Sequence, residues 1–168
     1  MVFLIFFVYG VLLFSIQTSL LDTLALAGVT PDLVLIATVY CALKLPGNRG
    51  WWVGGLLGFV QDALSSGILG INTFSKSLLA YIFSLLRSKL MVEGVIPVFA
   101  FLFAASLFDG FVFFAIARML FKNPPDPELF MGQLPLYAVY NAVLSPVLFW
   151  ILNRNQRWWM RKLELSAS

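Results

Sequence analysis

The chain has 168 residues, of which 61% are hydrophobic and only 11% are charged, and its formal net charge is +3. Globular domains carry about 25% charged residues, so this composition excludes an ordinary soluble domain and predicts an all-α membrane protein. It contains no histidine, which removes the commonest general base and metal ligand, and its single cysteine, Cys41, excludes an intrachain disulfide.

The first apolar run covers residues 2–21 and carries no charge, so it is long enough to cross a bilayer. Ala25, Leu26 and Ala27 resemble the cleavage site of a secretory signal peptide. However, no basic residue precedes the run, and it is longer than the apolar part of a typical signal peptide. We therefore expect a retained helix at this position.

Five more apolar segments follow, separated by turn residues. Together with the first run they predict a single integral membrane domain, residues 1–168, and a bundle of six transmembrane helices. The predicted later spans are residues 33–45, 51–64, 73–86, 95–121 and 134–152. The expected connections are an acidic turn at 22–32, a loop at 46–50, a loop or re-entrant turn at 65–72 and a non-helical loop at 122–128. Pro146 predicts a kink in the last span.

Basic residues indicate the orientation, because Lys and Arg near span ends stay in the cytoplasm. With the N-terminus inside, most of the basic residues fall on the cytoplasmic side: Lys44, Arg49, Arg87, Lys89, Arg154, Arg157, Arg161 and Lys162. The opposite side receives Lys76, Arg118 and Lys122, beside Asp22, Asp32, Asp126 and Glu128. We therefore predict that both termini are cytoplasmic. The basic and tryptophan-rich run 154–162 fits an anchor at the lipid headgroups, with binding of a cytoplasmic protein as the alternative.

Two acidic residues, Asp62 and Asp109, fall inside or at the edge of apolar spans, where an ionised side chain costs about 2.5–3.5 kcal/mol. Such residues are candidates for a ligand or proton site, but they more often pair with other polar groups. Asp62 could accept hydrogen bonds from the turn that follows it. For Asp109, Lys76 is the partner nearest in depth on another helix.

Glycines are concentrated in the third span, where Gly54 and Gly58 have the spacing of a GxxxG face. Small residues let helices in lipid approach closely, so tight packing within the chain is the favoured interpretation, and a pathway or a partner-binding groove is the alternative.

The sequence has no nucleophile elbow, phosphate-binding loop, HExxH or CxxC motif, so we predict a protein that is not an enzyme and has no cofactor. Nothing in it indicates a nucleic-acid partner. A membrane enzyme acting on lipids through Asp62 and Asp109 is a weaker alternative.

One segment carries a family resemblance. Pro31-Asp32-Leu33, the glycine-rich stretch 54–64 ending at Asp62-Ala63-Leu64, the turn 67–70 and Tyr81 together resemble the rod shape-determining protein MreD family. This detail covers residues 28–90, and the rest of the chain agrees in hydropathy. Asp32, Asp62 and Tyr81 match the family pattern.

The resemblance implies a non-enzymatic scaffold of the bacterial cell-elongation machinery, in the cytoplasmic (inner) membrane, that helps to maintain rod cell shape and lateral peptidoglycan synthesis. The implied partners are MreC, directly, and through it MreB, RodA and a class B penicillin-binding protein. The family fold resembles the six-helix substrate-binding components of energy-coupling-factor transporters, which implies a membrane cavity for a lipid or a partner's helix.

Two sets of candidate residues follow. Asp32, Asp62, Tyr81 and Asp109 are candidates for a cavity or a partner contact, and Gly54 and Gly58 are candidates for a groove that receives the membrane helix of MreC. A small-molecule (vitamin-type) transporter subunit is the alternative function, although the spans offer few polar residues for a polar vitamin.

Overall fold

The computed structural model describes residues 2–20, 25, 28–47, 49–65, 69–88 and 94–165. Over these residues the chain forms six α-helices and no β-strand. The helices are α1 (Val2–Leu20), α2 (Leu33–Lys44), α3 (Arg49–Leu64), α4 (Ile71–Leu86), α5 (Val95–Leu120) and α6 (Pro127–Leu165). The prediction of an all-helical chain with six helices is therefore confirmed.

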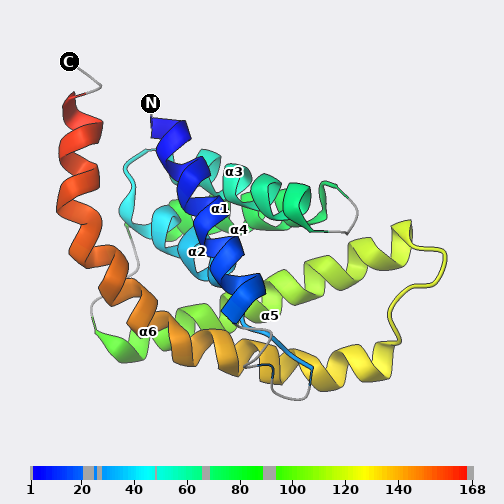
Figure 1. Cartoon of the computed structure of the whole chain (residues 1–168). Coiled ribbons are helices and arrows are strands. Elements are labelled where there is room, and N and C mark those ends of the chain that lie inside the picture. Colours follow the sequence, from blue (N-terminus) through cyan, green and yellow to red (C-terminus); the bar gives the residue numbers. More distant parts are fainter. Residues whose placement is uncertain are drawn as a thin grey trace.

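Helix α2 is the centre of the bundle. It packs against each of the other five helices, and every residue from Val34 to Leu43 is buried. In Figure 1, α5 and α6 run antiparallel along the lower side, α3 and α4 lie together above them, and α1 crosses in front of α2. The first turn of α1 and the last turns of α6 lie at the same end of the molecule in this view.

Helix α2 is short because a capping residue fixes its start and a turn fixes its end. The carboxylate of Asp32 caps the helix by accepting a hydrogen bond from the backbone N–H of Leu35 at 2.9 Å. At the other end, Leu45 leaves the helical conformation ahead of Pro46, and Gly47 adopts a positive φ of 61°. The 12 residues between these ends form a rod of about 18 Å. This is shorter than the hydrocarbon thickness of a bilayer, about 30 Å.

Helices α3 and α4 pack with their backbones in contact, and the glycines of α3 make this possible. A Cβ added to Gly58 would lie 2.5 Å from the carbonyl oxygen of Asn72 on α4. One added to Gly54 would lie 2.4 Å from the Cβ of Ala80. No larger residue fits at either position unless the two helices separate. Tight packing within the chain, the favoured interpretation of the GxxxG spacing, is what the structure shows.

The predicted loop boundaries were wrong at three places. Helix α6 begins at Pro127, so residues 127 and 128 belong to a helix and not to the 122–128 loop. Proline is well suited to the first helical position because its missing N–H has no partner there, and the Asp126 carboxylate accepts the N–H of Glu128 at 3.1 Å. Helix α3 begins at Arg49, inside the predicted 46–50 loop, and α4 begins at Ile71, inside the predicted 65–72 loop.

Helix α6 is also much longer than the predicted span 134–152, because it continues to Leu165. It contains Pro135 and Pro146, and Figure 1 shows that it changes direction along its length. A proline inside a helix removes one backbone hydrogen bond and favours such a bend.

Two of the six helices are long and apolar enough to cross a membrane by length and composition alone. They are α5 and the Pro127–Arg154 part of α6, within the portion of the chain that the structure describes. The apolar stretches Phe7–Ser19, Leu33–Lys44 and Ile71–Leu86 are shorter. The prediction of six full-length spans is thus tested only in part.

Candidate functional site

The centre of the candidate site is the side chain of Lys76, which is completely buried in the bundle. Its Nζ lies 3.0 Å from Oδ2 of Asp32 and 3.6 Å from Oδ2 of Asp109. It also donates to Oδ1 of Asn72 at 3.2 Å. The predicted pairing of Asp109 with Lys76 is therefore present in the structure.

The structure corrects the predicted charge distribution at two residues, Asp32 and Lys76. Both were counted among the charges on the side opposite the cytoplasm, but they lie inside the bundle, with exposed side-chain fractions of 8% and 0%. Asp32 is buried because it caps the central helix α2, and Lys76 is buried because α4 turns it towards that cap. Each compensates the charge of the other, which makes the burial of both tolerable.

Hydrogen bonds join Asp32 to two more helices. Its Oδ2 accepts from Nε2 of Gln61 on α3 at 3.1 Å. Its backbone N–H donates to Oδ1 of Asn141 on α6 at 2.7 Å. The Nδ2 of Asn141 in turn donates to Oγ of Ser106 on α5 at 3.1 Å. The N-terminus of α2 is thus held by α3 and α6, and Ser106 of α5 holds the Asn141 side chain in place.

Asp109 is held in the same way from the other side. The hydroxyl of Ser75 on α4 donates to its Oδ1, and the phenol of Tyr137 on α6 donates to its Oδ2 at 3.3 Å. Together with the ion pair to Lys76, these contacts occupy both carboxylate oxygens. Asp109 therefore links α5 to α4 and α6.

Asp62 forms a second polar cluster at the turn between α3 and α4. Its carboxylate accepts hydrogen bonds from the backbone N–H groups of Gly70, Asn72 and Thr73, and from the side chains of Asn72 and Thr73, at 2.6–3.0 Å. This is the structural role that the sequence predicted for Asp62. Asn72 bridges the two clusters, since its amide also accepts from Lys76.

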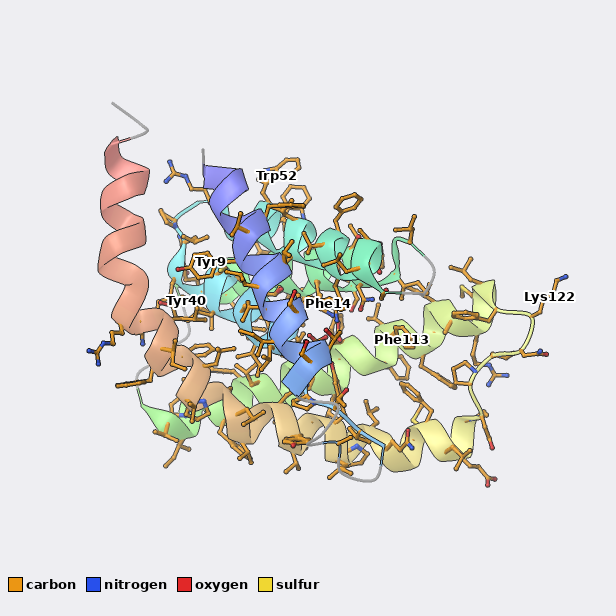
Figure 2. The ribbon with its side chains drawn as sticks, viewed as in Figure 1. Tyr9, Phe14, Tyr40, Trp52, Phe113 and Lys122 are labelled. Atoms are coloured by element: carbon orange, nitrogen blue, oxygen red, sulfur yellow. The ribbon has the colours of Figure 1, made fainter. Side chains whose placement is uncertain are left out.

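A pocket of about 550 Å³ adjoins the two acidic residues of the first cluster. It is lined by Gly28, Val29, Thr30, Asp32, Gln61, Asn72, Asp109, Gly110, Phe113, Phe130, Gln133, Leu134 and Tyr137. The pocket therefore lies between α5, α6 and the segment that leads into α2. Phe113, which is labelled in Figure 2, belongs to its α5 wall.

The other candidate residues lie away from the pocket. Gly54 and Gly58 face α4, so their surface is already occupied and cannot form a groove for a partner's helix. Tyr81 on α4 is about half exposed, with its ring centroid 6.0 Å from that of Trp51 on α3. Trp51 also contacts Trp52, at 4.9 Å between centroids.

Sequence reasoning did not assign a role to Gln61, Ser106 or Tyr137, which complete the site. Gln61 stands next to Asp62 within the motif that carried the family resemblance, and this position could have indicated that it belongs to the site. Tyr137 and Ser106 are common residues in membrane helices, and nothing in their local sequence distinguishes them.

A comparison with family models matches residues 1–155 to the model described as rod shape-determining protein MreD. No curated protein and no solved structure matches the chain. The family match covers almost the whole chain, far beyond the residues 28–90 that carried the resemblance by motif. It also accounts for the apolar composition and for the two long apolar helices α5 and α6, because this is a membrane family. The chain belongs to the MreD family of rod shape-determining membrane proteins, a structural family that is not known for enzymatic activity.

Proposed function

We propose that this chain is a non-enzymatic scaffold of the bacterial elongation complex that binds MreC directly. Through MreC it would associate with MreB, RodA and a class B penicillin-binding protein and so support lateral peptidoglycan synthesis. The single observation that carries the proposal is the family match over residues 1–155. The contacts around Lys76 support it, because the carboxylates there are held by donors from neighbouring helices and so serve to join the helices.

We place the scaffold in the cytoplasmic (inner) membrane as a multi-pass protein with both termini inside. The sorting of basic residues supports this orientation. So does the even number of helices in the described part of the chain, with the start of α1 and the end of α6 at one end of the molecule (Figure 1). In this arrangement α2, α3 and α4 are too short to span as isolated helices, and their neighbours would cover their ends. The similarity to energy-coupling-factor substrate-binding components remains a proposal of the same kind.

The surface that we propose for MreC is the aromatic patch of Trp51, Trp52 and Tyr81. These side chains are 36%, 57% and 48% exposed, although they are large and lie side by side on α3 and α4. Aromatic residues are enriched at the anchors of protein interfaces. The patch replaces the groove at Gly54 and Gly58, which α4 covers.

The proposal is tested by complementation and by co-purification. Expression of the chain in a rod-shaped bacterium depleted of its own MreD should restore rod shape, and MreC should co-purify with it. Double substitution Trp52→Ala and Tyr81→Ala should reduce recovery of MreC, because it removes two of the three rings of the patch. Phe59→Ala is the matched control, since Phe59 is an exposed aromatic residue on α3 outside the patch. Failure to restore shape despite normal membrane levels would contradict the scaffold proposal. Equal recovery of MreC with all variants would contradict the aromatic patch as the MreC surface, but not the scaffold proposal.

A vitamin-type transporter subunit remains the second candidate, and the pocket is the observation that favours it. Its volume of about 550 Å³ lies within the usual range for small-molecule sites, and polar groups from four helices converge there. Tight binding of a vitamin to the purified chain, together with failure to restore rod shape, would favour this candidate over the scaffold.

A further inference from the structure

The pocket beside Asp32 and Asp109 has an unbalanced negative charge. These two carboxylates line the pocket, and the one ammonium group that pairs with them among the described residues is that of Lys76. Two formal negative charges therefore face one positive charge. Asp62 adds a third carboxylate nearby, but five hydrogen bonds from the α3–α4 turn hold it there. A buried charge without a counter-charge is unfavourable, so this end of the pocket favours a cation.

A second, independent observation at the same place is the amide of Gln61. This residue lines the pocket and is only 7% exposed. Its Nε2 donates to Asp32, but its Oε1 is buried and has no hydrogen-bond partner. A buried acceptor without a donor is costly and rare in folded proteins. A ligand group that suits this end of the pocket is thus a hydrogen-bond donor as well as a cation.

The remaining walls indicate what carries that group. Phe113 from α5 and Phe130 and Leu134 from α6 form an apolar side of the pocket, and Phe130 also stacks on Phe114 at 4.8 Å between centroids. Aromatic faces attract cations and bury apolar groups. A bare metal ion would leave most of the 550 Å³ unfilled, and the described residues contain no cluster of three or more metal-ligating side chains.

We propose that this pocket binds an organic ammonium group carried on an apolar body, with the ammonium placed between Gln61 Oε1 and the carboxylates of Asp32 and Asp109. An ammonium group supplies both the positive charge and several N–H donors. The apolar body lies against Phe113, Phe130 and Leu134. The pocket adjoins the N-terminus of α2, the C-terminal half of α5 and the N-terminal part of α6. The charge pattern of the sequence assigns the connection between α5 and α6 to the outer side. The ammonium comes either from a free amine or from the headgroup of phosphatidylethanolamine. This inference does not depend on the scaffold function.

The test compares three probes that differ mainly in the terminal group: phenethylamine, 2-phenylethanol and phenylacetate. Binding to the purified full-length chain in detergent is measured by isothermal titration calorimetry. Phenethylamine should bind at least about tenfold more tightly than 2-phenylethanol, because hydrogen bonds to charged groups are stronger than neutral ones. Phenylacetate should not bind. Equal affinities for the amine and the alcohol would overturn the proposal, since they would show apolar partition only.

Variants locate the binding site. Gln61→Met removes the unpartnered acceptor and should weaken phenethylamine binding by about tenfold, the value of one hydrogen bond to a charged group. Gln17→Met is the matched control, because it also removes one hydrogen bond, the one that Oε1 of Gln17 accepts from the backbone N–H of Leu33. Gln17 does not line the pocket. Affinity should stay unchanged in that control. Equal effects of the two substitutions would contradict the proposal, and the wild-type comparison of probes stands even if a variant fails to fold.

A third arm distinguishes the two sources of the ammonium group. The titration is repeated in nanodiscs of phosphatidylglycerol alone and in nanodiscs that also contain phosphatidylethanolamine. A headgroup occupant would compete, so phenethylamine would bind more weakly when phosphatidylethanolamine is present. Equal affinity in both nanodiscs identifies a soluble amine as the natural source. Loss of the preference for phenethylamine over 2-phenylethanol in both nanodiscs would overturn the ammonium site itself.

Discussion

Replacing Lys76 by methionine should destabilise the bundle strongly, because it removes the positive charge that two buried carboxylates share. The ammonium lies 3.0 Å from Asp32 and 3.6 Å from Asp109. At an effective dielectric constant of about 20, Coulomb's law gives a gross attraction of about 5 kcal/mol for each contact. Desolvation of the three groups offsets most of this attraction in the native protein.

The loss of stability on substitution of Lys76 is therefore determined by the two carboxylate charges that remain buried, those of Asp32 and Asp109. Removing one partner of a buried ion pair costs about 3–5 kcal/mol, because the other charge remains buried without compensation. Here two carboxylates remain, so we expect a value at the upper end of that range. A loss of this size lowers the folding equilibrium constant by about two to four orders of magnitude.

The assay is equilibrium unfolding in mixed micelles of increasing dodecyl sulfate content, followed by tryptophan fluorescence and far-ultraviolet circular dichroism. The control is the triple variant Lys76→Met, Asp32→Asn, Asp109→Asn, which removes all three charges. Asparagine at position 32 is still a good helix N-cap. At position 109 its single amide oxygen can still accept from Ser75, and its NH2 group can donate to the phenol oxygen of Tyr137. The triple variant should recover most of the lost stability. The reasoning is refuted if Lys76→Met unfolds like the wild type, or if the triple variant is less stable than the single one.

Three further predictions concern packing, the turn and topology. Gly58→Ala should destabilise the folded bundle by about 1–3 kcal/mol, because the added Cβ would meet the backbone of α4. Gly132→Ala, at an open position on α6, should leave the stability unchanged or raise it. The same unfolding assay compares the two variants, and equal effects would contradict the packing argument. Asp62→Asn should cost about 2 kcal/mol, because the amide carries no charge and has only one oxygen to accept from the α3–α4 turn. Asp126→Asn, at an exposed helix start, should cost almost nothing. Limited proteolysis of the α3–α4 turn should accelerate only in the first variant, and unchanged cleavage would argue against the role of Asp62. A reporter fused after Lys162 should be active only as a cytoplasmic fusion, and periplasmic activity would refute the proposed orientation.

The helices were predictable from sequence because their signals are local. Apolar runs and the turn residues between them placed all six in the described residues. The predicted spans began two residues late at Arg49 and Ile71 and seven residues late at Pro127. The extension of α6 to Leu165 was not predicted, because a helix that leaves an apolar segment for a polar one gives no hydropathy signal. The central position of α2 was equally hidden, since a uniformly apolar segment does not show whether it faces lipid or other helices.

Part of the candidate site was predictable, because a charged side chain in lipid is costly unless it has a polar or charged partner. That argument found the pair of Asp109 and Lys76 and the hydrogen-bonded role of Asp62. It did not find the contact between Asp32 and Lys76, because Asp32 stands in a polar connecting segment that looked exposed. Whether such a segment folds back into the bundle depends on long-range contacts, such as the one from Asn141 to the backbone of Asp32.

The polar contacts around Lys76 have a consequence for how a scaffold of this family keeps its shape. In lipid, apolar side chains do not drive helices together as they do in water, so packing and interhelical hydrogen bonds set how one helix lies against the next. Here polar side chains on α3, α4, α5 and α6 all meet at the start of α2. A slip of any of these helices along its axis would break an ion pair or leave a buried polar group without a partner, and each such loss is costly. The network therefore fixes the register of the bundle, and with it the position of the exposed residues, such as Trp52 and Tyr81, that a partner protein would contact.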